Sequence, residues 1–197
     1  MKINHKVLAL WRACSDDIGR SNLRGLRFAK VPDRSVWRVE VTDGHWCVRA
    51  EITTEDDTEV PEFFIPPDIA QEVFKAARKA AKTSNLENLV TVTLVGEVLQ
   101  AFVVGGTQAW SWKHELVQFP NLDRVIPKPD RAPSLKADGV CLSLDILADV
   151  RAVLKDIDRY SVGVIFKIDD DQAPIRIEVP NPTPLLDLIF IVMPITR

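Results

Sequence analysis

Two prolines bracket residues 119–127 and limit the structures open to this stretch, which runs Phe-Pro-Asn-Leu-Asp-Arg-Val-Ile-Pro. Proline fixes φ and lacks a backbone N–H, so the stretch cannot continue as a helix or a central strand. Its apolar side chains are Phe119, Leu122, Val125 and Ile126. We therefore predict an extended connector between domains that packs against its neighbours instead of a flexible tether.

The composition is that of an ordinary globular protein. Hydrophobic residues make up 46% of the 197 residues and charged residues 27%, which is enough for one good-sized core or two small ones. The formal net charge is −3. No global positive field therefore indicates nucleic-acid binding, although a local basic face remains compatible with it.

The three cysteines, Cys14, Cys47 and Cys141, lie far apart and form no CxxC pair, and the three histidines show no metal-ligand spacing. Reduced thiols in a cytoplasmic protein are a simpler interpretation than a disulfide framework or a zinc site, and no cofactor is predicted. The N-terminus lacks the apolar core of a signal peptide. The longest apolar run, residues 188–195, is too short to span a bilayer. We expect a soluble cytoplasmic protein.

A helix followed by strands recurs three times along the chain, at a spacing of roughly sixty residues. Apolar residues near the helical period predict helices over residues 5–18, 68–83 and 142–157. Alternating apolar residues predict strands over 23–30, 36–41, 46–52, 63–65, 89–95, 97–104, 108–114, 162–168, 175–179 and 188–193. Short turns join the strands, which favours antiparallel pairing over βαβ units. The predicted fold class is α+β, with the helices on one face of antiparallel sheets.

No residue pattern identifies a catalytic centre. The sequence has no nucleophile elbow, no HExxH motif and no phosphate-binding loop, so we expect no enzymatic activity. Asp169, Asp170 and Asp171 offer carboxylates to a divalent cation. The ligand spacing of an EF-hand is absent, however, and an acidic turn between strands explains these residues more simply.

Basic side chains gather on about half of the second predicted helix and recur sparsely on the other two. They are Lys75, Arg78, Lys79 and Lys82, with Arg12 on the first helix and Arg151 and Lys155 on the third. Such a cluster is usually a solvated helix face, but cations on one surface also attract DNA phosphates. The DNA-binding interpretation gains weight if all three helices line one surface.

Three short segments, taken in order, resemble the bacterial sliding clamp family, the beta subunit of DNA polymerase III. They are Val-Thr-Asp-Gly-His at residues 41–45, the proline-bracketed stretch at residues 119–127, and Val-Met-Pro at residues 192–194. In that family each domain has two pseudo-repeated halves, each a helix with antiparallel strands. The helices line a central hole for duplex DNA, and the sheets form the outside. The resemblance implies a DNA-clamp-like fold of three half-domain units and a non-enzymatic role in DNA replication.

The resemblance also implies a domain organisation. Residues 1–127 resemble one complete domain, made of half-units 1–60 and 61–127 with the connector included. Residues 128–137 are a linker, and residues 138–197 resemble the second half of the family's last domain. Family rings contain twelve half-domain units, so four chains of three units would be needed for a ring. An odd number of units breaks the usual alternation of halves, and a smaller open assembly or a monomer is the alternative.

In the family, a pocket between the middle and last domains receives a short peptide motif carried by polymerases, the clamp loader and repair proteins. The resemblance implies that the pocket here is formed by Leu23, Thr42, Gly44, His45, Trp46, Cys47, Pro120, Val125, Pro174, Ile191 and Met193. Trp46 and Cys47 stand where the family usually has arginine and leucine, which predicts an altered affinity or specificity.

The first interpretation is a sliding-clamp-like processivity factor, a homo-oligomer that docks replication and repair proteins in the pocket. Its basic helices would face duplex DNA without reading its sequence. The alternative keeps the pocket and drops the ring: a truncated adaptor or competitor that captures clamp-binding motifs without encircling DNA. A third, an unrelated small enzyme on a similar fold, needs an active site that the sequence does not show.

Overall fold

The computed structural model describes most of the chain. The described residues are 1–17, 19–54, 60–83, 89–115, 117–127, 141–157, 163–168, 173–180 and 185–194. The predicted linker at residues 128–137 and the acidic residues 169–171 lie outside them.

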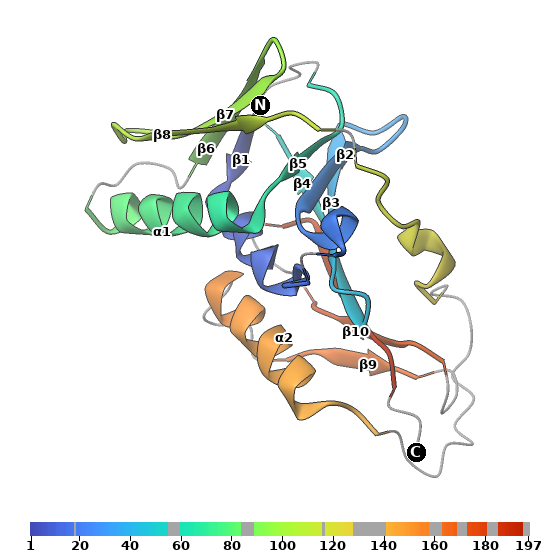
Figure 1. The fold of residues 1–197 in the computed structure, drawn as a ribbon. Coiled ribbons are helices and arrows are strands. Elements are labelled where there is room, and N and C mark those ends of the chain that lie inside the picture. The colour runs from blue at the N-terminus through green and yellow to red at the C-terminus, as the bar shows by residue number, and fades with distance from the viewer. Residues whose placement is uncertain are drawn as a thin grey trace.

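Two antiparallel sheets make up the strand layer (Figure 1). The larger sheet has seven strands in the order β5 (Phe63–Ile65), β2 (Leu26–Lys30), β3 (Val36–Thr42), β4 (Trp46–Thr53), β11 (Asp187–Val192), β10 (Ile175–Glu178) and β9 (Ile165–Lys167). The smaller sheet has four strands in the order β1 (Lys2–Asn4), β6 (Leu89–Val95), β7 (Val98–Val103) and β8 (Ala109–Lys113). The predicted α+β class with antiparallel sheets is confirmed.

The first two helix-and-strand units interlock by exchanging one strand each. β1 precedes the first helical segment, yet it pairs with β6 of the second unit, from Lys2↔Thr91 to Asn4↔Leu89. β5 precedes the second helix, yet it pairs with β2 of the first unit, from Leu26↔Ile65 to Phe28↔Phe63. Each unit therefore supplies an edge strand to the sheet of the other.

The third unit joins the first through a strand pair. β11 pairs with β4 over six positions, from Asp187↔Glu51 to Val192↔Trp46. The seven-stranded sheet is therefore continuous between residues that lie on opposite sides of the connector in the sequence.

The helical segments are η1 (His5–Ala13), α1 (Pro67–Thr83) and α2 (Leu144–Ile157). They lie together on one side of the strands, with η1 in contact with both α1 and α2 (Figure 1). Pro67 is the first residue of α1, where its missing N–H leaves no helical hydrogen bond unmade. Buried Ala70, Val73, Phe74 and Ala77 follow the i, i+3, i+4, i+7 spacing of an amphipathic helix. No helix among the described residues combines the length and apolar character that crossing a membrane requires.

The predicted helix over residues 5–18 is shorter and tighter than expected. η1 is a 3₁₀ helix that ends at Ala13, where Cys14 N–H donates to the carbonyl oxygen of Trp11. Ser15 N–H then donates to the carbonyl oxygen of Leu23 at 3.2 Å, which turns the chain away from the helix axis. Leu23 itself lies in the short 3₁₀ helix η2 (Ser21–Leu23) and not in the predicted strand over 23–30, which begins at Leu26.

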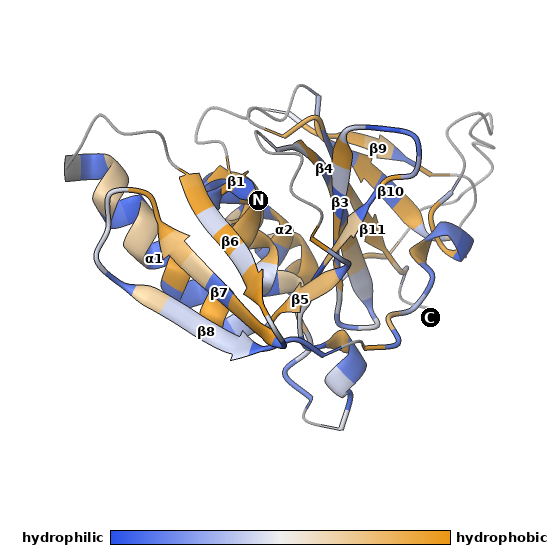
Figure 2. Cartoon of the chain, turned by 90° about the horizontal axis from the view of Figure 1, so that it is seen from above, coloured by the Kyte–Doolittle hydropathy of each residue, from blue (hydrophilic) through white to orange (hydrophobic). Residues whose placement is uncertain are grey.

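The main hydrophobic core fills the space between the strands and the helices. Phe28, Phe63 and Phe190 are among its largest fully buried side chains, and Figure 2 shows the largely hydrophobic β6 and β7 next to α1. A second, smaller cluster consists of Cys47, Leu122, Ile189 and Ile191, with Phe119 and Ile126 packed against it. The connector docks there, on the sheet face away from the helices (Figure 1).

Candidate functional site

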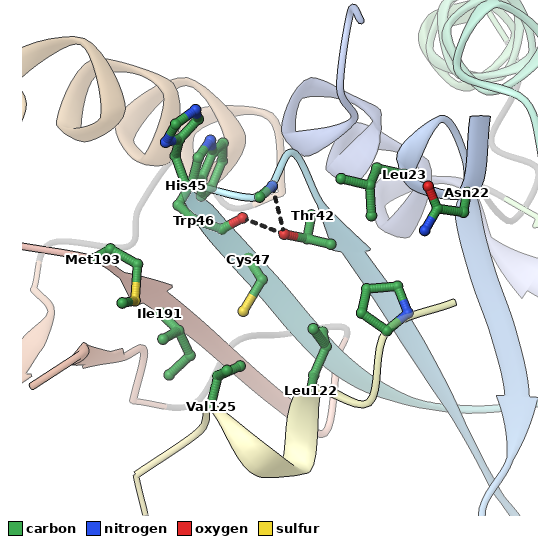
Figure 3. Close-up of a pocket in the computed structure, with 12 residues that line it drawn as sticks. Asn22, Leu23, Thr42, His45, Trp46, Cys47, Leu122, Val125, Ile191 and Met193 are labelled. Atoms are coloured by element: carbon green, nitrogen blue, oxygen red, sulfur yellow. Dashed lines mark hydrogen bonds between the residues drawn. The ribbon is translucent and has the colours of Figure 1, made fainter. Parts of the chain in front are cut away.

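A cavity of about 290 Å³ opens where the connector crosses the seven-stranded sheet (Figure 3). Its lining comes from η2 (Ser21–Leu23), from the turn before β4, from the end of β11 and from the connector. The lining residues are Asn22, Leu23, Thr42, Gly44, His45, Trp46, Cys47, Pro120, Leu122, Val125, Ile191 and Met193. The residues that border it are mostly apolar, which suits the cavity to hydrophobic side chains of a ligand.

Strand alternation sets the floor of the cavity. Cys47 on β4 pairs directly with Ile191 on β11, and both side chains belong to the cluster on the connector side. Their neighbours Trp46 and Phe190 belong to the main core on the other face, with ring centroids 6.2 Å apart. Trp46 is 3% exposed, so its indole packs into the core although the residue borders the cavity. Cys47, not Trp46, supplies the floor.

Burial raises the pKa of the Cys47 thiol to about 12. The thiol is therefore neutral at pH 7 and behaves as a small apolar group. With Ile191 and Leu122, which are 2% and 4% exposed, it forms a rigid apolar base.

The rim formed by residues 42–46 is held by its own hydrogen bonds. The Thr42 hydroxyl donates to the carbonyl oxygen of Trp46 at 2.7 Å and accepts from Gly44 N–H at 3.0 Å. Asp43 Oδ1 accepts from the N–H groups of His45 and Trp46 at 2.7 and 3.0 Å. Gly44 has a φ of +95°, a value that favours glycine. This explains why an Asp-Gly pair stands at the turn.

The connector and the end of β11 form the two walls. Leu122 begins the short 3₁₀ helix η3 (Leu122–Arg124), which is capped by the Asn121 side chain accepting from Asp123 N–H at 3.0 Å. Val125 and Met193 flank the mouth and are each 42% exposed. Met193 N–H donates to the carbonyl oxygen of His45 at 3.2 Å, which fixes the segment directly after β11 to the rim.

A network of ion pairs fastens the connector to the sheet beneath it. Arg49, itself 8% exposed, donates to Glu40 at 2.8 Å and to Asp123 of η3 at 2.7 Å. Arg27 donates to Glu40 at 2.7 Å and to Glu62 at 2.8 Å. The hydrogen bond from Arg49 holds the pKa of the Asp123 carboxyl below its usual value. These pairs hold η3, and with it Leu122, against the sheet beside Cys47 and Ile191.

Ten of the eleven residues predicted for the pocket line this one cavity, and Pro174 does not. Asn22 and Leu122 line it without having been predicted. The apolar pattern of the connector marked Leu122 as a packing residue, but no local pattern distinguishes the cavity side of η3. Asn22 carries no such signal, because it reaches the rim only through the turn that replaces the start of the predicted strand.

The residues predicted to face DNA lie on the helical side. Lys75, Lys79 and Lys82 are exposed on α1, and Arg151 and Lys155 are exposed on α2. Arg12 and Arg78 instead share the carboxylate of Asp156, which is 10% exposed, at 3.0 Å each. This triad joins η1, α1 and α2. The Asp156 carboxylate neutralises part of the positive charge of Arg12 and Arg78.

Acidic side chains dilute the basic character of this side. The α1 sequence contains four basic and two acidic residues, whereas α2 contains two basic and three acidic residues. A second cavity between the helical segments, of about 350 Å³, is bordered by Asp16, Asp68 and Asp149. Among the described residues no group of His, Cys, Asp and Glu is arranged to hold a metal ion. The positive surface is therefore concentrated on α1.

The chain is similar to known proteins in its fold, but no family model and no curated protein sequence matches it. Solved structures do match over 100% of the chain. Caulobacter crescentus pol III beta is 18% identical, with a TM-score of 0.71, and 65% of its length is covered. A Pseudomonas aeruginosa DNA polymerase III beta sliding clamp bound to griselimycin is 14% identical, with a TM-score of 0.70 and 65% of its length covered, and the Bacillus subtilis DNA polymerase sliding clamp is 14% identical, with a TM-score of 0.70 and 64% of its length covered. The chain therefore has the fold of bacterial DNA polymerase sliding clamps and spans about 65% of their length.

Proposed function

We propose that this protein is a non-enzymatic, sliding-clamp-like docking factor of DNA replication. It captures a short apolar peptide segment of a replication or repair protein in the cavity beneath the connector. The cavity carries the proposal, because two walls far apart in the sequence, the connector and the end of β11, meet over a shared floor on a sliding-clamp fold.

The chemistry of the cavity selects the kind of ligand. The floor residues Cys47, Leu122 and Ile191 offer no charge, so a charged side chain buried against them would lose its hydration without compensation. Leucine and phenylalanine side chains each gain about 1.5–3 kcal/mol on burial. Two such anchors supply about 3–6 kcal/mol before the costs of association, so they support weak binding and not a tight complex. Weak, exchangeable binding of this kind suits a platform shared by several partners.

The same proposal assigns duplex DNA to the helical side. Lys75, Lys79 and Lys82 lie on the exposed face of α1, where they can contact phosphates without reading bases. The cavity lies on the other face of the sheet, beside the connector. A bound partner would therefore not compete with DNA for the same surface.

Peptide titration tests the docking proposal. A fluorescent peptide containing one leucine and one phenylalanine is titrated with the wild type, Met193→Glu and Met193→Leu, after circular dichroism has shown each variant to be folded. Because Met193 is 42% exposed, the new carboxylate stays partly hydrated, and we expect a loss of affinity on the order of tenfold instead of abolition. Met193→Leu keeps the apolar wall and should bind like the wild type.

Equal affinities for the wild type and a folded Met193→Glu variant would contradict the assignment of the cavity. Griselimycin, to which the similar Pseudomonas aeruginosa clamp is bound, serves as a second probe. We expect it to compete with the peptide for the wild type. Simultaneous binding of both would place the two ligands at separate sites.

A further inference from the structure

The last strand of each helix-and-strand unit occupies a comparable place, and one of the three has an open edge. These last strands are β4, β8 and β11. β4 and β11 pair with each other, which joins the first and third units. β8 pairs with β7 and ends the four-stranded sheet, at the outer edge in Figure 2. Within the described residues, the edge that corresponds to the β4–β11 junction is thus unpaired on β8.

The open edge presents hydrogen-bonding backbone groups. His114 N–H donates to the carbonyl oxygen of Glu97 at 2.8 Å, so the backbone groups of residue 114 point toward β7. Alternate residues of an antiparallel strand point to opposite sides. The backbone groups of Ala109, Ser111 and Lys113 therefore point toward the open edge. Natural edge strands are commonly blocked by proline or several charges, whereas β8 has no proline and one charge, Lys113.

The β8 sequence is complementary to itself in an antiparallel arrangement centred on Ser111. Ser111 would then lie opposite the second copy's Ser111, Trp110 opposite its Trp112, and Ala109 opposite its Lys113. No like charges would face each other, and aromatic cross-strand pairs stabilise sheets. Both indoles are already positioned, because Trp110 Nε1–H donates to Glu72 at 2.9 Å and Trp112 Nε1–H donates to the carbonyl oxygen of Phe64 at 2.7 Å.

The outer face of the same sheet gives a further reason for pairing. Val98 and Phe102 on β7 lie beside Lys113 and Ala109 of β8, and they are 40% and 38% exposed. In the self-paired sheet, the aliphatic part of Lys113 would lie between Val98 of its own chain and Ala109 and Phe102 of the second copy. Lysine stems cover apolar surface while the ammonium group stays in water. Pairing would therefore reduce the exposure of both apolar side chains.

We infer that β8 pairs antiparallel with β8 of a second copy of this chain, about a two-fold axis at Ser111, and that this strand pair is a self-association surface. The inference specifies a partner for the clamp-like protein but rests on strand topology alone. It does not depend on peptide docking in the cavity.

Introducing a charge at Ser111 tests the two-fold arrangement, because the substituted residue would lie opposite its own copy in the second chain. Ser111→Lys and Ser111→Glu each place like charges opposite one another, which destabilises the strand pair. Light scattering should give the wild type at least twice the chain mass of 22.1 kDa, and each variant alone half the wild-type mass. An equimolar mixture of the two variants should regain the wild-type mass, because lysine then faces glutamate.

Thr93→Lys is the matched control. Thr93 lies in the same row across the sheet, beside Gln100, which lies beside Ser111, but it is two strands away from the open edge. It should leave the mass unchanged. A monomeric wild type at high concentration, variants with the wild-type mass, or a mixture that stays at half mass would each overturn the inference.

The same samples separate this inference from the docking proposal. The Ser111 variants should bind the leucine- and phenylalanine-containing peptide as the wild type does. A protein that binds the peptide but remains a monomer rejects the β8 pairing alone. A protein that associates through Ser111 but binds no peptide rejects the docking proposal alone.

Discussion

At the scale of single residues, Gly44 determines the shape of the cavity rim. Its φ is +95°, and a Cβ there would lie 3.0 Å from Arg20 Nη1 and 3.6 Å from Leu23 Cδ1. We expect Gly44→Ala to lower the free energy of unfolding by about 1–2 kcal/mol, because a side chain is strained in the left-handed region. It should also weaken peptide binding by displacing Leu23. Denaturant unfolding and peptide titration measure the two effects.

Gly96→Ala is the control for Gly44→Ala. Gly96 also has a positive φ, +62°, but a Cβ there would meet nothing within 4 Å. This variant should lose stability through the same backbone strain and keep its affinity for the peptide. If both variants bound the peptide equally well, the rim would not shape the binding site.

Asp123 should make the docking of the connector dependent on pH. Its pKa is lowered in the folded protein, because its carboxylate accepts a hydrogen bond from Arg49. A carboxyl group of this kind stabilises the fold above its unfolded pKa, near 4, and loses that contribution as the pH falls through the lower folded pKa. Its side chain is 62% exposed, so the contribution at pH 7 is at most about 1 kcal/mol.

Unfolding by denaturant, measured for the wild type and Asp123→Asn between pH 7 and about pH 3, tests this dependence. The wild type should be more stable at pH 7, and the difference in the free energy of unfolding should shrink as the solution is acidified. A difference that is constant or grows toward low pH would show that the Arg49 contact does not depend on the Asp123 charge.

At the scale of elements, α1 is the part of the proposed DNA surface that a charge-reversal experiment can isolate. Lys75 and Lys82 are exposed on it, and neither forms an ion pair with another described residue, as Arg78 does with Asp156. We expect Lys75→Glu/Lys82→Glu to weaken binding to duplex DNA for every sequence tested. The slope of log K against log salt should become shallower by roughly one for each phosphate that the variant no longer neutralises.

Lys30→Glu/Arg124→Glu is a control with the same change in net charge. Both residues are exposed, on β2 and on η3, away from the helical side. This pair should change DNA affinity only slightly. If the two double variants lost DNA affinity equally, the effect would come from net charge and not from the α1 face.

Helices and strands whose signals lie within their own residues could be predicted from the sequence, whereas an element that depends on a distant partner could not. α1 was predicted to begin at Asp68 and begins at Pro67, because proline, a buried stripe and a basic face all lie within the helix. β3 and β4 were predicted almost to the residue, because Asp43-Gly44 fixes the turn between two alternating runs. β1 was not predicted, since three residues carry no alternation and their partner, β6, lies far along the chain.

The candidate site was predictable only through the resemblance. Which side chains of β4 face the cavity was not predictable. The resemblance based on the stretches 41–45, 119–127 and 192–194 located ten lining residues, six of which lie within those stretches. The face on which Cys47 and Trp46 lie depends on the pairing of β4 with β11. A shift of that pairing by one residue would exchange the two side chains. The resemblance therefore assigned Trp46 to the pocket, whereas its ring packs in the core.

At the scale of the whole molecule, the two sheets and the three helical segments form an arc with the helices on one side (Figure 1). Junctions of two kinds hold the arc together: exchanged strands between the first two units and the β4–β11 pair between the first and third. Both are two-fold in character, because the strand exchange is reciprocal and the β4–β11 pair joins comparable strands antiparallel. Self-association through β8 would repeat the second kind between chains, and the two chains that it joins would together hold six units, an even number.

Retention on DNA tests whether such an assembly encircles the duplex. An assembly that encircles the duplex should remain bound to a closed circle at a salt concentration that removes simple electrostatic contacts. It should leave when a restriction enzyme cuts the circle, because a topological link needs no phosphate contact. Ser111→Lys, with its β8 pairing disrupted, should lose retention and keep its affinity for the peptide. A wild type that binds the peptide but is never retained on circular DNA would instead support the adaptor that captures clamp-binding motifs without forming a ring.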